Sequence, residues 1–418
     1  MARQGREISV NGRRYRWPGR PVVVVCIDGS EPDYIERAVA AGVMPFTAEM
    51  LSHGADLRAE CVVPSFTNPN NLSIVTGAPP AVHGICGNYF YDREADAEVM
   101  MNEPRFLRAG TIFEAFEKAG ARVAVVTAKD KLRRLLGRGL DFTGGRSICF
   151  SAEQADRASV AENGIADVSD LVGMPLPTVY SAELSEFVFA AGVVLMQDRR
   201  PDIMYLTTTD YVQHKHPPGA PRANDFYAMM DGYWAKLDAL GATLALTADH
   251  GMNAKHDAQG APDVLYLQDI LDAMLGPGAA RVILPITDPY VAHHGALGGF
   301  ATAYLADGID PAEVIERLAI LDGVACALSR AEACRRFELP EDRLGDVIVV
   351  AGKHKVIGSS PDRHDLSALE QPLRSHGGIS EQTVPLILNR PIAPLPADRR
   401  LRNFDVFDLA LNHAIVPE

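Results

Sequence analysis

Short apolar runs alternate with longer helical patterns along most of this chain. The apolar runs are continuous rather than interrupted by polar residues, which is typical of strands buried on both faces. They lie at Val22–Ile27, Arg122–Thr127, Ile203–Thr207, Thr243–Thr247 and Val384–Leu388. The helical patterns lie at Glu31–Ala41, Thr111–Ala119, Ala182–Gln197 and Phe226–Leu240. Because the two kinds of segment alternate, the pattern predicts an α/β protein with a mostly parallel sheet sandwiched by helices.

The pattern changes between His250 and His376, where shorter strands and helices follow one another. These elements are expected, in order, at Phe300–Leu305, Pro311–Leu321, Val324–Leu328, Arg330–Phe337 and Asp346–Val350. No candidate metal ligand stands at the ends of these strands. We therefore expect a smaller α+β cap over residues 260–370. It would be inserted into a catalytic core formed by residues 1–259 and 371–418.

The composition narrows the class of protein. Apolar residues make up 47% of the 418 positions, enough for a substantial core, and a formal charge of −14 disfavours a nucleic-acid partner. The longest helix-like apolar stretch, near residues 187–196, is about half of the ~20 residues that span a bilayer, so no membrane association is expected. Six scattered cysteines without a C-x-x-C pair favour a cytoplasmic location. The sequence does not define the oligomeric state, and a homodimer is compatible with it.

Acidic and histidine residues recur just past the predicted strands. Asp28, Asp210 and Asp249 each follow a predicted strand, His214 and His250 come within a few residues of them, and His376 stands where the chain returns from the expected insertion. Each has an ordinary interpretation when taken alone, as a capping residue, part of a solvated helix face or a loop histidine. The carboxyl ends of parallel strands gather at one edge of a sheet, so these side chains can converge there. Three aspartates and three histidines suffice for two hard or borderline metal ions, and the combination indicates an enzyme.

Two pairs among these six residues are informative because of their spacing along the chain. Asp210 and His214 are four residues apart, so a helical turn would place both on one face. Asp249 and His250 are adjacent at the end of a buried strand. An acid and an imidazole are costly to bury there without a partner, and a cation would supply one.

Thr67 is the candidate nucleophile, in the segment Pro64-Ser-Phe-Thr-Asn68 before a helical pattern. Its hydroxyl is a poor nucleophile at neutral pH, but coordination to a divalent cation lowers its pKa. The alternative is a threonine that caps the helix. The two roles are compatible, because a helix amino terminus also favours a bound anion.

Five segments together resemble the alkaline phosphatase superfamily, in its nucleotide pyrophosphatase/phosphodiesterase-like branch. They are CIDG (26–29), PSFTNPNNLSIVTGAPPAVHGICGN (64–88), DYVQH (210–214), ADHGM (248–252) and SHGG (375–378). The resemblance implies an alkaline-phosphatase-like fold, a site for two metal ions, usually zinc, and a phosphorylated enzyme intermediate. Manganese or iron(II) would suit the same ligands. Sulfatase activity is disfavoured, because Thr67 replaces the Cys or Ser of the sulfatase motif.

The resemblance also implies a role for each matching residue. One metal ion would be held by Asp210, His214 and His376. The other would be held by Asp28, Asp249, His250 and the Thr67 oxygen. Asn88 matches the asparagine that such enzymes direct at a phosphoryl oxygen, and His214 is also expected to contact the substrate.

Lys129 and Lys131 follow the predicted strand at Arg122–Thr127. In an extended backbone they can point the same way, although two solvated surface lysines are the ordinary alternative. They resemble the paired lysines with which some members of the branch hold the carboxylate of phosphonoacetate. The implied reaction cleaves the carbon–phosphorus bond to give acetate and phosphate, through a phosphothreonine, with Thr67, Asn88, Lys129 and Lys131 as catalytic residues.

Two other functions stay open. One is a phosphodiesterase or nucleotide pyrophosphatase on the same metal core, and the other is a noncatalytic protein that metal ions stabilise. Three further histidines, His256, His293 and His294, could approach the pocket.

Overall fold

The computed structural model describes residues 5–288, 295–367 and 369–415. Its centre is a seven-stranded sheet in the order β4-β19-β10-β3-β9-β7-β8. The strands are β3 (Val22–Cys26), β4 (Ala55–Glu60), β7 (Val123–Thr127), β8 (Ser147–Ser151), β9 (Ile203–Thr207), β10 (Thr243–Thr247) and β19 (Thr383–Leu388). In this sheet only β19 runs against the other strands. The predicted mostly parallel sheet is confirmed.

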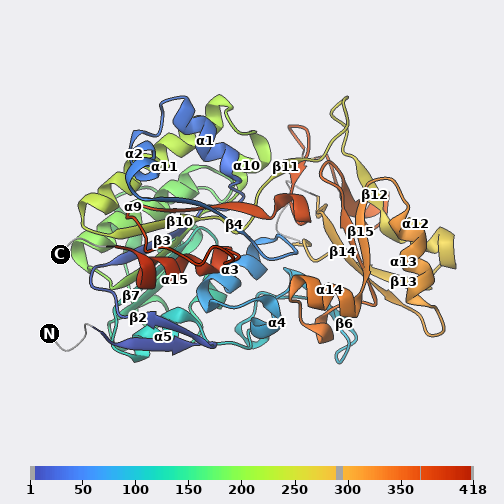
Figure 1. Cartoon of the computed structure of the whole chain (residues 1–418), viewed down its shortest axis with the longest axis horizontal. Coiled ribbons are helices and arrows are strands. Elements are labelled where there is room, and N and C mark those ends of the chain that lie inside the picture. Colours follow the sequence, from blue (N-terminus) through green and yellow to red (C-terminus); the bar gives the residue numbers. More distant parts are fainter. Residues whose placement is uncertain (1–4, 289–294, 368, 416–418) are drawn as a thin grey trace.

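Helices cover both faces of this sheet (Figure 1). On β3, Val23 and Val25 face one apolar layer and Val22 and Val24 face the other, which explains the continuous apolar run. The first layer contains α1 (Pro32–Ala40), α2 (Pro45–His53), α9 (Glu183–Asp198) and α11 (Pro221–Ala239). The second contains α3 (Thr67–Thr76), α5 (Ile112–Lys118), α6 (Asp130–Leu136) and α15 (Val406–Asp408). The predicted sandwich of helices is therefore confirmed as well.

The differences from the predicted elements have physical reasons. Helix α11 begins at Pro221, five residues before the expected start, because proline suits the first helical position and the apolar periodicity becomes clear only later. Strand β4 carries charged residues between its apolar ones, as an edge strand does, and was not expected. An amino-terminal hairpin of β1 (Glu7–Val10) and β2 (Arg13–Arg16) was also not expected.

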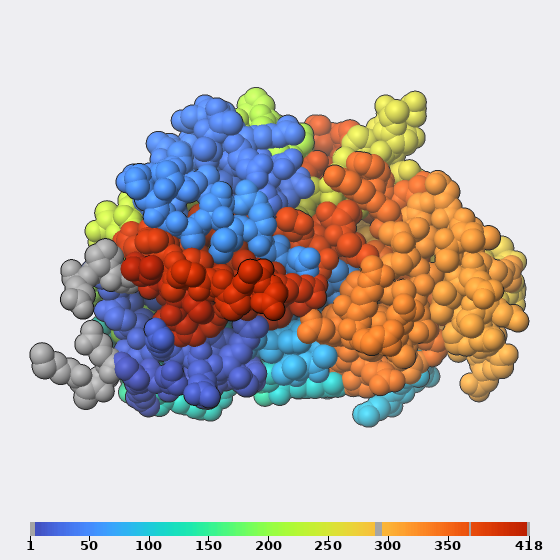
Figure 2. Space-filling view, in the orientation of Figure 1, coloured from blue at the N-terminus to red at the C-terminus, as the bar shows by residue number. Residues whose placement is uncertain are grey.

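A second, antiparallel sheet forms the other end of the molecule. Its order is β13 (Ala280–Ile283), β14 (Phe300–Leu305), β16 (Val347–Ala351) and β15 (Val324–Ser329). Around it lie α12 (Leu267–Leu275), α13 (Pro311–Ala319), α14 (Arg330–Phe337) and the paired strands β12 (Val264–Tyr266) and β17 (Val356–Gly358). Figures 1 and 2 show these yellow-to-orange segments beside the core. The sheet falls within the expected insertion, whose boundaries at 260 and 370 stay a prediction.

The chain leaves and re-enters the core at neighbouring points. The short strand β11 (Asn253–Ala254) pairs antiparallel with β18 (Arg374–Ser375). This pairing brings His376, which follows β18, back beside the loop that follows β10. Within the part of the chain that the structure describes, no helix combines the length and the apolarity needed to cross a bilayer.

Candidate metal and nucleophile site

Three loops at one edge of the central sheet carry the predicted aspartates. Asp28 follows β3, Asp210 follows β9 and Asp249 follows β10, each within three residues of the strand end. Since β3, β9 and β10 are parallel neighbours, their ends lie side by side. All three carboxylates are buried. The predicted convergence of these acids is therefore what the topology produces.

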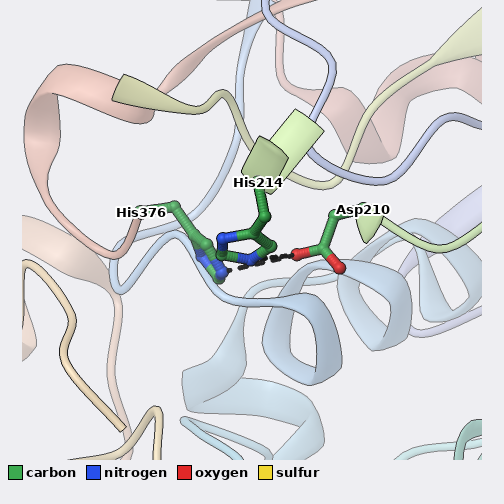
Figure 3. Close-up of side chains that lie close together, drawn as sticks. All are labelled: Asp210, His214 and His376. Carbon is green, nitrogen blue, oxygen red and sulfur yellow. Dashed lines mark ion pairs between the residues drawn. The ribbon is translucent and has the colours of Figure 1, made fainter. Parts of the chain in front are cut away.

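Asp210, His214 and His376 form one group of possible ligands (Figure 3). Asp210 directly precedes α10 (Tyr211–Lys215), and the turn brings His214 Nε2 to 2.9 Å from the Asp210 carboxylate. His376 Nε2 lies 3.7 Å from the same carboxylate. One ligand atom from each residue lies within 4.8 Å of the others. The spacing of four residues thus places Asp210 and His214 on one face, as predicted.

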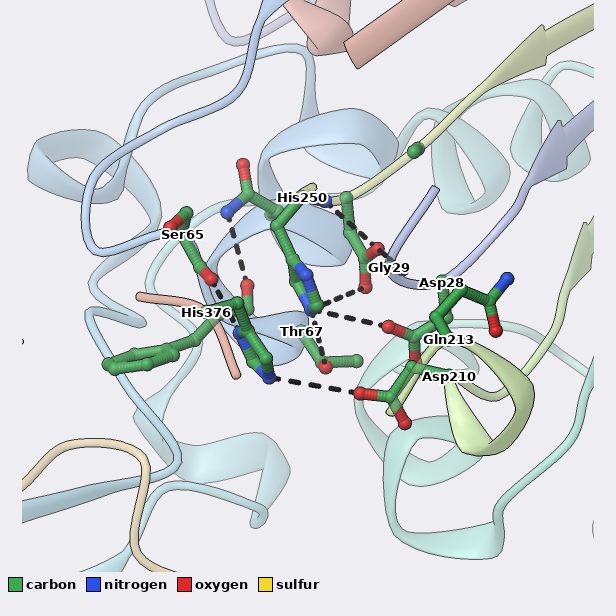
Figure 4. Close-up of polar contacts among 12 residues, drawn as sticks. Asp28, Gly29, Ser65, Thr67, Asp210, Gln213, His250 and His376 are labelled. Atoms are coloured by element: carbon green, nitrogen blue, oxygen red, sulfur yellow. Dashed lines mark hydrogen bonds and ion pairs between the residues drawn. The ribbon is translucent and has the colours of Figure 1, made fainter. Parts of the chain in front are cut away.

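Asp28, Asp249 and His250 form a second group with the same mutual reach. His250 Nε2 lies 3.2 Å from Asp28 and 3.8 Å from Asp249, and the Thr67 hydroxyl lies 3.4 Å from this nitrogen (Figure 4). The rings of His250 and His376 stack with centroids 3.6 Å apart, at an interplanar angle of 7°. The two groups are therefore adjacent, with Thr67 at the second.

The three histidines share one orientation. Each engages a backbone carbonyl through Nδ1 and turns Nε2 towards the carboxylates. The carbonyls belong to Arg374, Gly251 and Ser65, at 2.7, 2.9 and 2.8 Å from His214, His250 and His376 respectively. A carbonyl that accepts the Nδ1 proton selects the tautomer whose Nε2 lone pair can bind a metal ion. This donor set fits two divalent cations.

The pKa values of these residues in the protein without metal ions also indicate a site for cations. Burial, reinforced by the carboxylates of Asp210 and Asp249, raises the pKa of Asp28 well above its usual range. Burial lowers the pKa of His250, but Asp249 and Asp28 outweigh it and raise that pKa to about 10. Burial and the neighbouring His250 hold the pKa of His376 well below its usual range. Bound cations would offset the cost of gathering these carboxylates.

Thr67 is the first residue of α3, and the capping position belongs to Phe66, which makes no side-chain cap. The structure therefore excludes the alternative in which Thr67 caps this helix. Its backbone is already helical, so the hydroxyl is directed to His250 rather than to the N–H groups of the next turn. The amino end of α3, where backbone N–H groups favour anions, lies at the pocket.

A small pocket, with a cavity volume of about 60 Å³, opens beside both groups. Thr67, Asn88, Lys129 and Lys131 line it together, although they come from separate segments. The other lining residues are Asp28, Asn68, Leu132, Thr208, Thr209, Asp210, Ile286, Asp288 and His376. The structure therefore places all four predicted catalytic side chains around one space.

The two lysines reach this space from a helix start. Lys129 is the capping residue of α6 and Lys131 lies in its first turn, so the extended backbone expected between them is wrong. Burial, with the like charge of Lys129, lowers the pKa of Lys131 to about 8. The Lys131 ammonium pairs with Asp288, and Lys129 Nζ lies 5.4 Å from the ring centre of Tyr180.

Asp288 and Ile286 were missed in the sequence. They follow β13, within the insertion for which no strand-end ligand was expected, and both line the pocket. An acid after an apolar strand was the available signal, but β13 itself was not predicted. His256 is half-buried and makes a 2.9 Å contact with the Asp257 carbonyl, away from the residues that line the pocket. His293 and His294 lie outside the described residues.

A helix-flanked, mostly parallel sheet with paired Asp/His groups and a threonine at a helix start defines an alkaline-phosphatase-like protein. The chain belongs to the type I phosphodiesterase / nucleotide pyrophosphatase family, whose model matches residues 22–378. Two structures of phosphonoacetate hydrolase from Sinorhizobium meliloti 1021, one in complex with phosphonoformate and one with phosphonoacetate, are 61% identical to this chain. Each match covers 99% of this chain and 100% of that one, with a TM-score of 0.96.

Curated relatives match over shorter stretches. An ectonucleotide pyrophosphatase/phosphodiesterase of Caenorhabditis elegans is 31% identical over 111 residues, which cover 25% of this chain and 14% of that protein. A phosphonoacetate hydrolase of Penicillium oxalicum is 56% identical over 41 residues, which cover 9% of this chain and 57% of that protein. The chain thus spans only a small part of the first relative.

Proposed function

We propose that this protein hydrolyses the carbon–phosphorus bond of phosphonoacetate, giving acetate and phosphate through a phosphothreonine. One observation carries the proposal: Lys129 and Lys131 line the same small pocket as Thr67 and lie beside both Asp/His groups. Two ammonium groups suit a carboxylate. The similarity to phosphonoacetate hydrolase over nearly the whole chain supports the same substrate.

We propose two divalent ions, with zinc as the expected metal. Asp210, His214 and His376 would hold one ion, and Asp28, Asp249, His250 and the Thr67 oxygen would hold the other. The ions would neutralise charge on the phosphonate oxygens and lower the pKa of the Thr67 hydroxyl. Aspartate and histidine ligands suit zinc, and they also accept manganese or iron(II).

In the first step the Thr67 hydroxyl gives up its proton to water and its oxygen attacks phosphorus. The new oxygen–phosphorus bond forms as the phosphorus–carbon bond breaks, in line, and the electron pair of the broken bond passes to the methylene carbon. A simple carbanion would be too basic to leave, but the neighbouring carboxylate delocalises this pair as an enolate-like dianion. Lys129 and Lys131 stabilise the dianion as it forms, and a proton from water completes acetate.

In the second step water attacks the phosphorus of the phosphothreonine from the side that acetate has left. The bond between phosphorus and the Thr67 oxygen breaks, the threonine recovers a proton, and phosphate is released. The Asn88 amide, which lines the pocket, donates a hydrogen bond to a phosphoryl oxygen in both steps. We propose that His214, which lies beside Asp210, also contacts the substrate.

The pocket favours a small dianionic substrate over a nucleotide. Its cavity of about 60 Å³ is far smaller than the open hollow of about 1040 Å³ over the inserted sheet. Among the described lining residues, His376 contributes the one aromatic ring, whereas a nucleotide base needs an apolar or aromatic surface on which to stack. The two lysines instead offer positive charge within this small pocket.

A substrate panel tests the proposal. After chelation and addition of zinc or manganese, we expect turnover of phosphonoacetate to exceed that of phosphonopyruvate, phosphonoacetaldehyde and a bis-aryl phosphodiester. Acetate and phosphate should form in equal amounts. Faster cleavage of the phosphodiester than of phosphonoacetate would favour a phosphodiesterase. No turnover of any phosphoryl substrate would favour a noncatalytic metal-binding protein.

We also propose a cytoplasmic location, which the six free cysteines support. A homodimer stays a prediction from the sequence.

A further inference from the structure

We infer that Asp288, supplied by the inserted region, is a positioning residue for Lys131 and thereby determines specificity for a substrate that carries one carboxylate. The inference rests on the proposed function. It concerns a residue that the sequence motifs did not include.

Asp288 lies in the loop that follows β13, and its side chain is 3% exposed. Its carboxylate forms an ion pair with the Lys131 ammonium, and both residues line the pocket. An ammonium has three N–H donors, so an ion pair with Asp288 leaves donors free for a substrate carboxylate. The ion pair therefore orients the Lys131 side chain and still leaves N–H donors of its ammonium for a substrate carboxylate.

The loop that carries Asp288 is attached to the segment that carries Asn88. The Asn88 backbone N–H donates to the Pro285 carbonyl at 2.8 Å, and its side-chain amide donates to the Ile286 carbonyl at 3.4 Å. A turn from Leu284 to Thr287, closed by a 2.9 Å hydrogen bond, then presents Asp288 to the pocket. The same loop thus holds in place both Asn88, the predicted phosphoryl contact, and Asp288, the partner of Lys131.

The groups around Lys131 act on its pKa in opposite directions, and the Asp288 carboxylate adds to those that favour the ammonium form. Burial and Lys129 lower the pKa of Lys131, while Glu153 and Asp210 act in the opposite direction. A carboxylate in direct contact favours the ammonium form and fixes the direction of its long side chain. Lys129, Lys131 and Asp288 together carry a net charge of about +1, by formal count, which matches a single substrate carboxylate.

The test compares Asp288→Asn with Asp263→Asn in the full-length, metal-loaded protein. Asp263 is a matched control, because it forms a 2.8 Å ion pair with Lys355 elsewhere in the inserted region. For Asp288→Asn we expect kcat/KM for phosphonoacetate to fall about 10-fold, as for one charge-assisted contact. Cleavage of an aryl phosphoester, which lacks a carboxylate, should change less than about twofold, within the range of ordinary surface substitutions. Asp263→Asn should change neither.

A pH profile adds a readout that a purely structural role would not change. The ammonium form of Lys131 is the active one, so kcat/KM for phosphonoacetate should decline as the pH rises through its pKa. Loss of the Asp288 charge lowers that pKa, so the decline should begin at a pH roughly one unit lower. The profile for the aryl phosphoester should not move.

Three results would overturn the inference. They are an equal loss with both substrates, an unshifted pH profile, or a lower KM for phosphonoacetate, which would make Asp288 a competitor of the substrate. Failure of the proposed function would look different, since the wild-type protein itself would then not cleave phosphonoacetate and the inference would fall with it.

Discussion

Replacement of Thr67 by alanine is expected to reduce phosphate release from phosphonoacetate by at least about 10³-fold, because it removes the oxygen proposed to attack phosphorus. The hydroxyl lies 3.4 Å from His250 Nε2 at the start of α3 and lines the pocket. The six Asp and His residues of the two groups are unchanged by the substitution. Bound metal, measured by elemental analysis, should therefore stay close to the wild-type amount.

Thr67→Ser is the matched control, since it restores a hydroxyl at the same position. We expect it to recover a substantial part of the activity and to become phosphorylated on rapid quenching, as the wild type should. Retention of phosphate release in Thr67→Ala, at more than about a tenth of the wild-type rate, would contradict a threonine nucleophile.

Chelation is expected to abolish turnover and to lower the melting temperature. Without cations, the buried carboxylates of Asp28, Asp210 and Asp249 repel one another, and burial disfavours their ionised forms. Ligands that bind only the folded state stabilise it by mass action, by about 2.7 kcal/mol at 100 times the dissociation constant. Addition of zinc should restore both properties, with turnover measured by phosphate release and stability by thermal unfolding.

Asp249→Asn provides a matched comparison, because it removes the charge of one proposed ligand while keeping the size of the side chain. We expect weaker metal retention and a smaller stabilisation by zinc. Full activity in metal-stripped protein, verified by elemental analysis, would exclude a role for the ions in the reaction.

The central strands could be predicted because their bounds follow from continuous apolar runs in the local sequence. Strands β9 and β10 begin and end where the apolar runs do, since both faces of each strand are covered by helices. Edge strand β4 escaped prediction because its charged residues interrupt the apolar run. Its strand character comes from pairing with β19, which is distant in the sequence.

The candidate site, too, could be predicted from the sequence only in part. The convergence of Asp28, Asp210 and Asp249 followed from strand ends and parallel order, so it could be expected before the structure was known. The contact of Asp288 with Lys131 depends on how the inserted region packs against the core, and no spacing in the sequence encodes it. Thr67 does lie at a helix start, but as the first helical residue, because the capping position belongs to Phe66.

The central claim is that the two Asp/His groups and Thr67 perform phosphoryl transfer, while Lys129 and Lys131 select a carboxylate-bearing phosphonate. The most direct measurement is the ratio of kcat/KM for phosphonoacetate to that for an aryl phosphoester, in the wild type and in Lys131→Ala. Lys118→Ala is the control, because Lys118 is exposed and pairs only with Glu114 among the ion pairs described. We predict that the ratio falls about 10- to 100-fold in Lys131→Ala, as for the loss of one charge-assisted hydrogen bond, and stays constant in Lys118→Ala. An unchanged ratio in Lys131→Ala, with both substrates slowed equally, would contradict the account.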